Sequence, residues 1–447
     1  MAFQKLFNRF NYIKNHQGFQ KYFHNTKWLF IAQFSRLIAG FLVGVWVARY
    51  FGPTKFGIFS YVLAFTSLFA GIAKLGLDGI IVRDLVNEPE KRNIYLGTAF
   101  WLKIIGALLV LGLIAIAVQF TSNDAITNLY IFIIASGLIF QSFEVIDFYF
   151  QSKVLSKFVS LSQMAQIFLS SLLKVFFILT HAGLIWFVIV SGFDQITLAA
   201  SLLFAYKYQK LPNFFRYFDL GTAKKLLMSS WPLILGGIAI MVQARIDQIM
   251  INEMIGPKEL GYFAAAMKFI EIFGFIPMII SLSIAPAITN AKKKSYSKYL
   301  QRLQNYYSLM FLLFIIIAIP ILFAGKYFLL LLFGDKFAYA GTLFSLMAFR
   351  LFFTNMGVAK HQYILNEGLF YLSFISAFIG AFVNIAFNYI FIPLYGAKGA
   401  ILVSYISFFV TLFIFELFYK KTRLNIVIMF KGIIFSYNIF NKKSWRV

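Results

Sequence analysis

The sequence predicts an all-α polytopic membrane protein of about twelve transmembrane helices, in two six-helix lobes around a central cationic cavity. Hydrophobic residues make up 61% of the chain and charged residues 13%, with a mean hydropathy of +0.79. Such a chain is too apolar for a water-soluble surface. Apolar stretches of about 20 residues recur along it, which is the length of a helical span rather than of a barrel strand. A repeated motif further divides the chain in two.

The repeated motif lies at Gly52–Phe59 (GPTKFGIF) and again, 204 residues later, at Gly256–Phe263 (GPKELGYF). Each copy follows one apolar stretch and begins the next. Proline is tolerated where a helix begins but not in its interior, and the flanking glycines allow two helices to turn and pack closely. We therefore expect two copies of one unit, each with a tight hairpin. A chance match of common turn residues is the alternative.

The chain begins with a basic segment, residues 1–27, in which apolar residues recur at helical spacing. We expect this segment to lie along the membrane surface. It has no short apolar core followed by a small-residue cleavage site, so no cleavable signal peptide is predicted.

The apolar stretches divide six and six, into an N-lobe at 28–206 and a C-lobe at 228–418, joined by a polar connector at 207–227. The predicted spans are residues 28–49, 56–75, 95–119, 127–149, 157–179, 183–205, 228–251, 260–285, 305–323, 337–359, 369–392 and 398–418.

The basic tail, residues 419–447, is amphipathic. Its apolar stretch, 425–440, is interrupted by Lys431 and suits an interfacial helix better than a span. A pair of further spans, for a total of fourteen, remains an alternative.

Lysine and arginine are distributed unequally between the predicted loops. The side of the N-terminus carries 29 of them and the opposite side carries 6. Positively charged loops stay in the cytoplasm, so we expect both termini and the connector there. The net charge of +25 thus mainly reflects the topology. The basic loops also contact anionic lipid headgroups, and no nucleic-acid partner is required to explain the charge.

Patterns typical of enzymes are missing. The chain has no cysteine, which excludes disulfides, thiolate metal sites and cysteine nucleophiles. Its four histidines are scattered, and no Gly-rich phosphate-binding loop occurs. We predict no catalytic residue, metal or cofactor. A membrane polymerase or glycosyltransferase is disfavoured because no predicted loop is long enough for a catalytic domain.

We select eleven charged residues inside the predicted spans as site candidates. A charge near the bilayer centre costs at least about 2.5 kcal/mol, so each should face a partner or a water-filled cavity. The cations are Arg36, Lys103, Lys174, Arg245, Lys268 and Arg350, and the acids are Glu144, Asp147, Asp194, Asp247 and Glu271.

Polar residues also gather on single faces of several spans, at 100° per residue. The aligned sets are Gln33 with Arg36, Gln163 and Gln166 with Lys174, Gln141 with Glu144 and Asp147, Thr354 and His361 with Arg350, and Asn384 with Asn388. These faces predict a wet, largely cationic interior that can hold a polar ligand.

Structural roles are the alternatives. Lys268 and Glu271, at i and i+3, could neutralise each other. Arg245 and Lys103 lie near span ends and could extend to the interface. The two asparagines could simply hold helices together. The cations without an acidic neighbour at helical spacing are Arg36, Lys174 and Arg350.

Three stretches carry a family resemblance: Arg49–Gly57, Ala73–Asp84 and Arg245–Met250. Their order and spacing, within two halves of six spans over about residues 28–418, resemble the polysaccharide-transport branch of the multidrug/oligosaccharidyl-lipid/polysaccharide (MOP) exporter superfamily. No single motif is diagnostic. Within that branch the chain looks most similar to a Wzx-type O-antigen flippase.

The resemblance implies a MATE-like fold in a bacterial inner membrane. It implies alternating-access transport of an undecaprenyl-pyrophosphate-linked oligosaccharide, an O-antigen or related surface repeat unit, to the periplasmic leaflet. The implied partners are this lipid-linked substrate, membrane lipids, H⁺ or Na⁺ as coupling ion, and a polysaccharide polymerase machinery.

The residue chemistry fits this implication, because cations bind phosphates and amides bind sugars. The expected phosphate-binding residues are Arg36, Lys103, Lys174, Lys268 and Arg350; the expected sugar-binding residues are Gln33, Gln163, Gln166, Asn384 and Asn388; and the ion-coupling candidates are Glu144, Asp147, Asp194 and Asp247. Two rivals share the fold: a multidrug antiporter, whose cationic substrates would favour an acidic cavity, and a peptidoglycan-precursor flippase.

Overall fold

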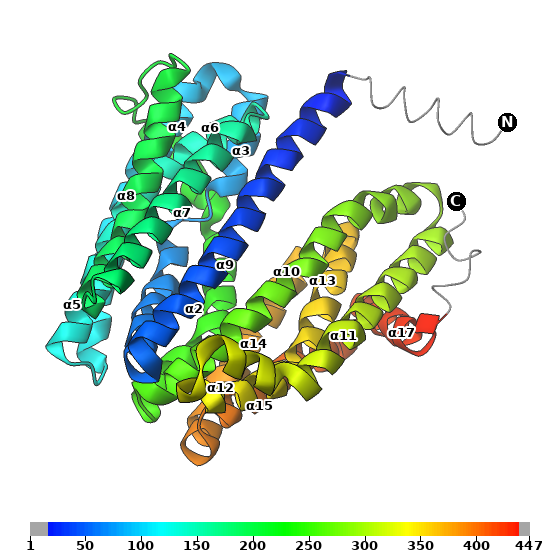
Figure 1. Ribbon diagram of the computed structural model, residues 1–447. Helices are drawn as coiled ribbons and strands as arrows, with labels where there is room; N and C mark the ends of the chain where they lie inside the picture. Colours follow the sequence, from blue (N-terminus) through cyan, green and yellow to red (C-terminus); the bar gives the residue numbers. More distant parts are fainter. Residues whose placement is uncertain (1–16, 438–447) are drawn as a thin grey trace. The chain divides into compact units, whose positions relative to one another are not determined.

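The computed structural model describes residues 17–437, and the regular structure among them is entirely helical (Figure 1). Residues 1–16 of the predicted surface segment, which spans 1–27, lie outside the described residues. The α-helices are α2 (Gln17–Ala73), α3 (Asp78–Asn87), α4 (Arg92–Ala117), α5 (Ala125–Ser136), α6 (Val145–Ser152), α7 (Ser156–Leu179), α8 (Leu184–Tyr208), α9 (Leu220–Met254), α10 (Pro257–Lys294), α11 (Tyr296–Phe333), α12 (Ala338–Met347), α13 (Arg350–Glu367), α14 (Phe370–Tyr395), α15 (Ala397–Phe409), α16 (Phe415–Phe418) and α17 (Lys420–Ile434). Shorter 3₁₀ segments are η1 (Pro89–Lys91), η2 (Val118–Phe120), η3 (Gly137–Glu144) and η4 (Asp335–Phe337), and η5 (Val410–Ile414) is a π-helix.

Ten helical stretches in the described part of the chain are long and apolar enough to cross a membrane, or eleven if a pair bent by 44° counts as one span. The bent pair, Asp335–Met347 with Arg350–Glu367, covers the predicted span 337–359. The first stretch, Lys27–Asn87, covers both 28–49 and 56–75, because the helix continues through a kink at Gly52 instead of breaking into a loop. Every predicted span therefore coincides with a helical stretch, and the all-α prediction is confirmed.

The chain divides into two compact units, and one of them takes a segment from the other half of the sequence. The first unit holds Thr66–Ile238 and the chain up to Val47. The second holds Ala48–Phe65 and the chain from Ala239 onward. Both copies of the repeated motif consequently belong to the second unit.

The two copies turn in the same way and pack against each other. Gly52 has φ +69° and Gly256 has φ +121°, and Pro53 and Pro257 directly follow them at a helix start. Such a φ is unfavourable for residues with a Cβ, so glycine is required at these turns. A Cβ built on Gly57 would collide with the carbonyl oxygen of Pro257. The motif thus sets a close helix contact within the second unit.

The connector is folded onto the first unit instead of hanging in solvent. Phe214 is fully buried, and the indole N–H of Trp101 donates to the carbonyl oxygen of Phe215 at 2.9 Å. The backbone N–H of Asp219 donates to Thr98 Oγ1 at 3.1 Å. Asp219 Oδ2 in turn accepts from the backbone N–H of Thr222 at 2.6 Å, which caps the first turn of α9.

The tail helix α17 packs on α11 in the second unit through buried polar contacts. Tyr307 Oη donates to Asn425 Oδ1 at 2.7 Å, and Ser308 Oγ donates to the carbonyl oxygen of Gly432 at 2.8 Å. With 15 residues, α17 is shorter than the roughly 20 needed for a span. It is not among the candidate spans of the described residues.

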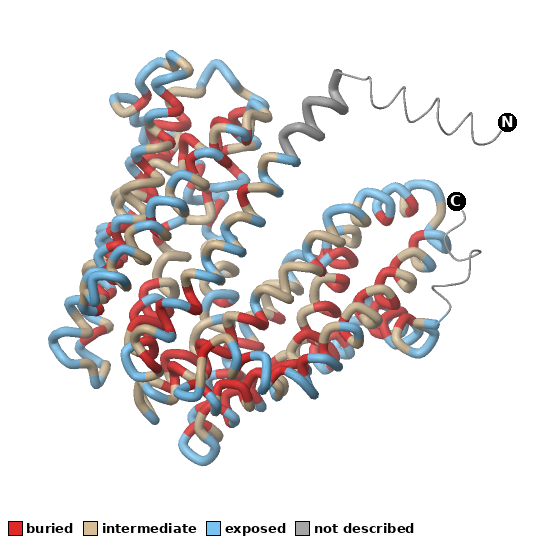
Figure 2. The backbone as a smooth tube through the Cα atoms, in the orientation of Figure 1, coloured by how far each residue is buried: buried red, intermediate tan, exposed pale blue. Residues whose placement is uncertain are grey.

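Many large apolar side chains are exposed. Buried positions concentrate where helices of one unit pack together (Figure 2). Exposed residues include Phe168, Phe204, Leu331 and Phe382. A surface of this kind matches the acyl chains of a bilayer rather than water.

Candidate functional site

Four of the predicted site residues form one hydrogen-bonded network in the second unit. Asp247 on α9 is only 2% exposed, and its carboxylate accepts from Asn388 Nδ2 and from Ser404 Oγ, both at 2.7 Å. Asn388 Nδ2 also donates to Asn384 Oδ1 at 2.8 Å, and Arg350 Nη1 donates to Ser404 Oγ at 3.1 Å. Residues from α9, α13, α14 and α15 thereby converge on one buried acid.

The carboxylate of Asp247 accepts from neutral donors, and Ser404 links Arg350 to it. Asn388 Oδ1 is buried beside it and has no hydrogen-bond partner. A buried acceptor without a partner is costly and marks a place where a proton or cation would be stabilised. The network therefore has the oxygen ligands for a small cation, although the described residues contain no cluster of three acids or histidines.

A cavity of about 580 Å³ lies in the same unit, walled by α9, α10, α13, α14 and the segment around η5. This volume is within the range of ordinary small-molecule sites. Its polar lining consists of Gln243, Ser281, Thr354, Lys360, His361, Ser373, Ser376 and Thr411, and its aromatic lining consists of Phe275, Phe353 and Phe408. No carboxylate is among the lining residues.

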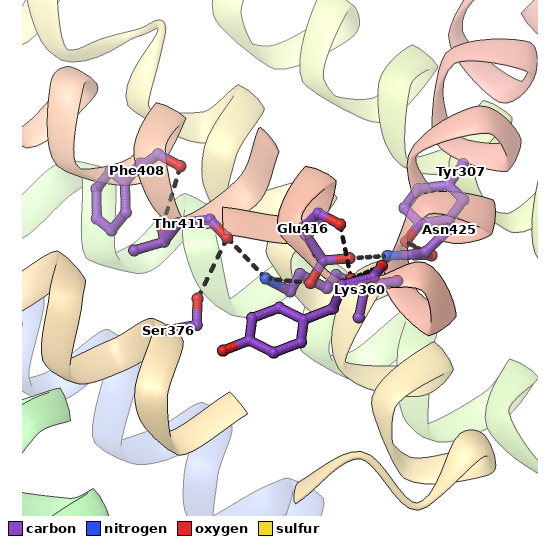
Figure 3. Close-up of polar contacts among 9 residues, drawn as sticks. Tyr307, Lys360, Ser376, Phe408, Thr411, Glu416 and Asn425 are labelled. Carbon is purple, nitrogen blue, oxygen red and sulfur yellow. Dashed lines mark hydrogen bonds and ion pairs between the residues drawn. The ribbon is translucent and has the colours of Figure 1, made fainter. Parts of the chain in front are cut away.

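Lys360 and Glu416 form a buried ion pair that the sequence-based prediction missed (Figure 3). Lys360 Nζ lies 2.8 Å from Glu416 Oε1, with side chains 11% and 1% exposed. Lys360 directly follows the predicted span 337–359, so its position in the sequence counts it among the 29 lysines and arginines of the loops on the side of the N-terminus. Glu416 lies inside the predicted span 398–418, and the rule that selected Asp247 would have selected it too.

In the first unit the structure pairs predicted cations with predicted acids across helices. Lys103 on α4 contacts Glu144 Oε2 at 2.8 Å, and the lysine side chain is 1% exposed. Lys103 is thus buried rather than extended to the interface. Lys174 on α7 lies 3.6 Å from Asp194 on α8 and donates to Ser170 at 2.9 Å.

Other predicted residues of the first unit lie outside these pairs. Asp147 accepts a hydrogen bond from Gln151 at 2.9 Å. Arg36 is exposed on α2 and forms no ion pair within residues 17–437. The remaining predicted polar residues, Gln33, Gln163 and Gln166, are partly buried.

The suggested Lys268–Glu271 pair is replaced by contacts to other helices. Glu271 pairs with Arg245 on α9 at 2.9 Å, and the two side chains are 49% and 32% exposed. Lys268 Nζ lies 5.6 Å from the centre of the Phe56 ring, within the range of a cation–π interaction. The i,i+3 spacing rule applies within one helix, so it does not predict partners on neighbouring helices.

Comparison with known proteins decides the family. A family model described as "Polysaccharide biosynthesis protein" matches residues 23–273, more than half of the 447-residue chain. The chain belongs to this family. A second model, MatE, matches residues 232–390. The Capsular polysaccharide biosynthesis protein CapF of Staphylococcus aureus is 22% identical over 417 residues, covering 89% of this chain and 99% of CapF.

Solved structures establish the fold of this family member. It superposes on an inward-facing multidrug resistance MATE transporter of the MOP superfamily with a TM-score of 0.66, at 16% identity, covering 89% of this chain and 96% of the other. The lipid II flippase MurJ in an inward closed conformation gives a TM-score of 0.57 at 16% identity, covering 93% and 99%. The prediction of a multi-pass membrane protein with the MATE/MOP fold is confirmed.

Proposed function

We propose that this protein is a flippase that moves an undecaprenyl-pyrophosphate-linked oligosaccharide, the repeat unit of O-antigen or a related surface polysaccharide, across the bacterial inner membrane. The observation that carries the proposal is the family match over residues 23–273. A transporter fold within a polysaccharide-biosynthesis family calls for a substrate that is made on one side of a membrane and used on the other. Lipid-linked repeat units meet that description, and a polysaccharide polymerase machinery would consume the product.

The predicted cations supply chemistry suited to the pyrophosphate. Arg36, Lys174 and Arg350 lie within membrane-spanning helices, where a phosphate would be attracted strongly because water is scarce. Lys103 and Lys174 are balanced by Glu144 and Asp194. A substrate phosphate would compete with these acids for the cations. Amides such as Gln163 and Gln166 would bind sugar hydroxyls.

Coupling to an ion gradient would use the competition between the acids and the substrate phosphate for the lysines. A proton or Na⁺ on Glu144 or Asp194 would release its lysine for substrate, and loss of the ion would restore the pair. Asp147 and Asp247 are further candidates. Of the four acids, Asp247 has the strongest support, because the unpartnered Asn388 Oδ1 lies in its network. Alternating access would expose the bound substrate first to one leaflet and then to the other.

A multidrug antiporter is the second candidate, because the MATE transporter shares the fold. The cations Lys103 and Lys360, which are buried, and Lys174, which is partly buried, favour an anionic ligand over the cationic ones of such an exporter. A peptidoglycan-precursor flippase is a third candidate, since the solved structure of MurJ is similar too. Its substrate shares the lipid pyrophosphate.

The deciding experiment is translocation in proteoliposomes that contain the purified full-length protein. The probe is a fluorescent undecaprenyl-pyrophosphate oligosaccharide, and far-leaflet glycan is detected with an impermeant oxidant, with and without an imposed proton or sodium gradient. We expect protein-dependent movement that one gradient accelerates. Export of a cationic dye without movement of any lipid-linked sugar would assign the protein to the multidrug branch.

The cation roles are tested in the same assay with Arg36→Gln, Lys174→Gln and Arg350→Gln. Lys336→Gln is the matched control, because Lys336 is exposed. Normal transport by all three variants at normal protein levels would overturn these roles.

A further inference from the structure

One member of the Lys360–Glu416 pair lines the cavity in the second unit, and the other does not. Lys360 lines the cavity, and its Nζ donates to the carbonyl oxygen of Thr411 at 2.8 Å in addition to pairing with Glu416. Figure 3 shows the ammonium group between that carbonyl oxygen and the carboxylate. An ammonium group has three donors. The pair and the carbonyl use two, so the third is available for a ligand in the cavity.

Glu416 is held from the far side by groups that do not depend on Lys360. Asn425 Nδ2 donates to Glu416 Oε2 at 3.1 Å, and Tyr307 Oη fixes Asn425 by donating to its Oδ1 at 2.7 Å. These contacts come from α17 and α11. The carboxylate therefore keeps a hydrogen-bond donor if Lys360 moves toward the cavity, which lowers the cost of such a move.

The carbonyl oxygen that receives Lys360 belongs to the π-helix η5, Val410–Ile414. Thr411 O accepts from Ser376 Oγ at 3.2 Å as well as from Lys360. Single π-turns inside α-helices free carbonyl groups from the regular ladder and are frequent at functional sites. The irregular backbone and the cation thus meet at the same edge of the cavity.

The lining of the cavity points to a sugar that carries a negative charge. Hydroxyl groups from Ser281, Thr354, Ser373 and Ser376 can bond to sugar hydroxyls, and three phenylalanine rings can stack on the apolar faces of a sugar ring. Lys360 is the cation at its edge, and no carboxylate lines it. An anionic ligand in the cavity would meet Lys360 directly, whereas the Glu416 carboxylate is not part of the lining.

We propose that this cavity binds the phosphate-bearing sugar of a glycosyl phosphate, that Lys360 contacts the phosphate, and that Glu416 is the counter-ion from which Lys360 is exchanged. The proposal rests on the proposed function only for the source of the sugar phosphate, which could be lipid-linked or free. Its preference for an anionic sugar rests on the lining residues and the ion pair.

The test is calorimetric titration of the full-length protein in phosphatidylcholine nanodiscs. The probes are N-acetylglucosamine 1-phosphate and geranyl-diphosphate-linked N-acetylglucosamine, with neutral octyl glucoside and phosphatidylglycerol as comparators. Removing either charge alone leaves the other buried and unpaired, so the main variant is Lys360→Gln combined with Glu416→Gln. Lys336→Gln is the matched control, and size-exclusion profiles verify the fold of each variant.

We expect the double variant to bind the sugar phosphate about tenfold more weakly, the typical effect of losing a hydrogen bond to a charged group. Its affinity for octyl glucoside should stay within twofold of wild type. Glu416→Gln alone should bind the sugar phosphate more tightly, because Lys360 loses its competing carboxylate. Tighter binding of the geranyl-linked probe than of the free sugar phosphate would identify the lipid-linked source, and equal affinities would identify the free one.

Unchanged affinity of a correctly folded double variant would overturn the proposal. So would displacement of both sugar phosphates by phosphatidylglycerol, because the site would then belong to a phospholipid headgroup. The transport assay separates this inference from the proposed function. Failed translocation with Lys360-dependent binding would refute the flippase alone, whereas intact translocation with Lys360-independent binding would refute the cavity assignment alone.

Discussion

The carbonyl oxygen of Pro257 occupies the space that a Cβ on Gly57 would need, and the carbonyl oxygen of Pro53 stands in the same relation to Gly261. The two copies of the repeated motif therefore pack reciprocally, backbone against backbone. Small residues at such positions let helices approach within the bilayer, where packing replaces the hydrophobic effect as the source of association. The sequence repeat is thus a contact surface as well as a pair of turns.

Gly57→Ala and Gly261→Ala should each destabilise the protein by about 1–3 kcal/mol or more, because overpacking against backbone cannot be relieved by a rotamer change. The measurement is thermal unfolding of the purified protein in detergent. Gly112→Ala is the control, since a Cβ there meets nothing within 4 Å. Equal melting temperatures for Gly57→Ala and Gly112→Ala would show that the close contact does not exist.

Glu144→Gln should destabilise the first unit by about 3–5 kcal/mol, the usual cost of breaking a buried ion pair from one side. The variant leaves Lys103, which is 1% exposed, without its carboxylate. Combining Glu144→Gln with Lys103→Gln should recover most of the loss in thermal unfolding. Lys91→Gln, which breaks an exposed pair with Glu88, should change little. A double variant no more stable than Glu144→Gln would contradict this account.

Asp247→Asn should slow gradient-driven transport by on the order of tenfold, the scale of a typical coupling free energy. Without a gradient, exchange of the lipid-linked probe between leaflets should continue, because the phosphate-binding cations are unchanged. The comparison uses the proteoliposome assay, with the exposed Asp335→Asn as control. If Asp247→Asn retained the full response to the gradient, the coupling role would have to pass to another acid.

Asp219 should stabilise the protein in a pH-dependent way. Hydrogen bonds from the side chain and the backbone N–H of Thr222 lower the pKa of the Asp219 carboxyl. A folded-state pKa below the unfolded value of about 3.9 means that the contribution is complete above that value and is lost as the pH falls through the folded pKa. The melting temperature of wild type should exceed that of Asp219→Ala at pH 7, and the difference should shrink below about pH 4.

Asp219→Asn serves as the control for this pH dependence. Asparagine is also a good N-cap but does not titrate. The Asn variant should therefore exceed the Ala variant in melting temperature by an amount that does not vary with pH. A constant difference between wild type and Asp219→Ala from pH 3 to 7 would refute the carboxylate's role.

The lysine and arginine distribution predicts the orientation. With 29 of these residues on the side of the termini and 6 on the other, a C-terminal alkaline phosphatase fusion should be inactive and a green fluorescent protein fusion at the same place fluorescent. A phosphatase inserted next to Lys336 should be active. Phosphatase activity at the C-terminus would reverse the assignment.

Part of the candidate site could be predicted from helical periodicity. Asp247, Arg350, Asn384 and Asn388 were each selected because they are polar residues within apolar spans, and the structure joins them in one network. The partners of Lys103 and Lys174 could not be assigned, because they lie on other helices. Periodicity gives the direction in which a side chain points around its own helix. It does not identify the residue on another helix that faces this side chain.

The sequence by itself determined that this protein is an all-helical membrane protein with a repeated Gly-Pro motif, because span length, hydropathy and the motif are local properties of the chain. The tertiary structure alone decided that Lys360 is buried against Glu416 and that the connector packs Phe214 into the first unit. It also decided that both copies of the motif lie in one unit. These outcomes depend on which helices pack together. The hydropathy of the chain specifies which segments enter the bilayer but hardly specifies which of them become neighbours.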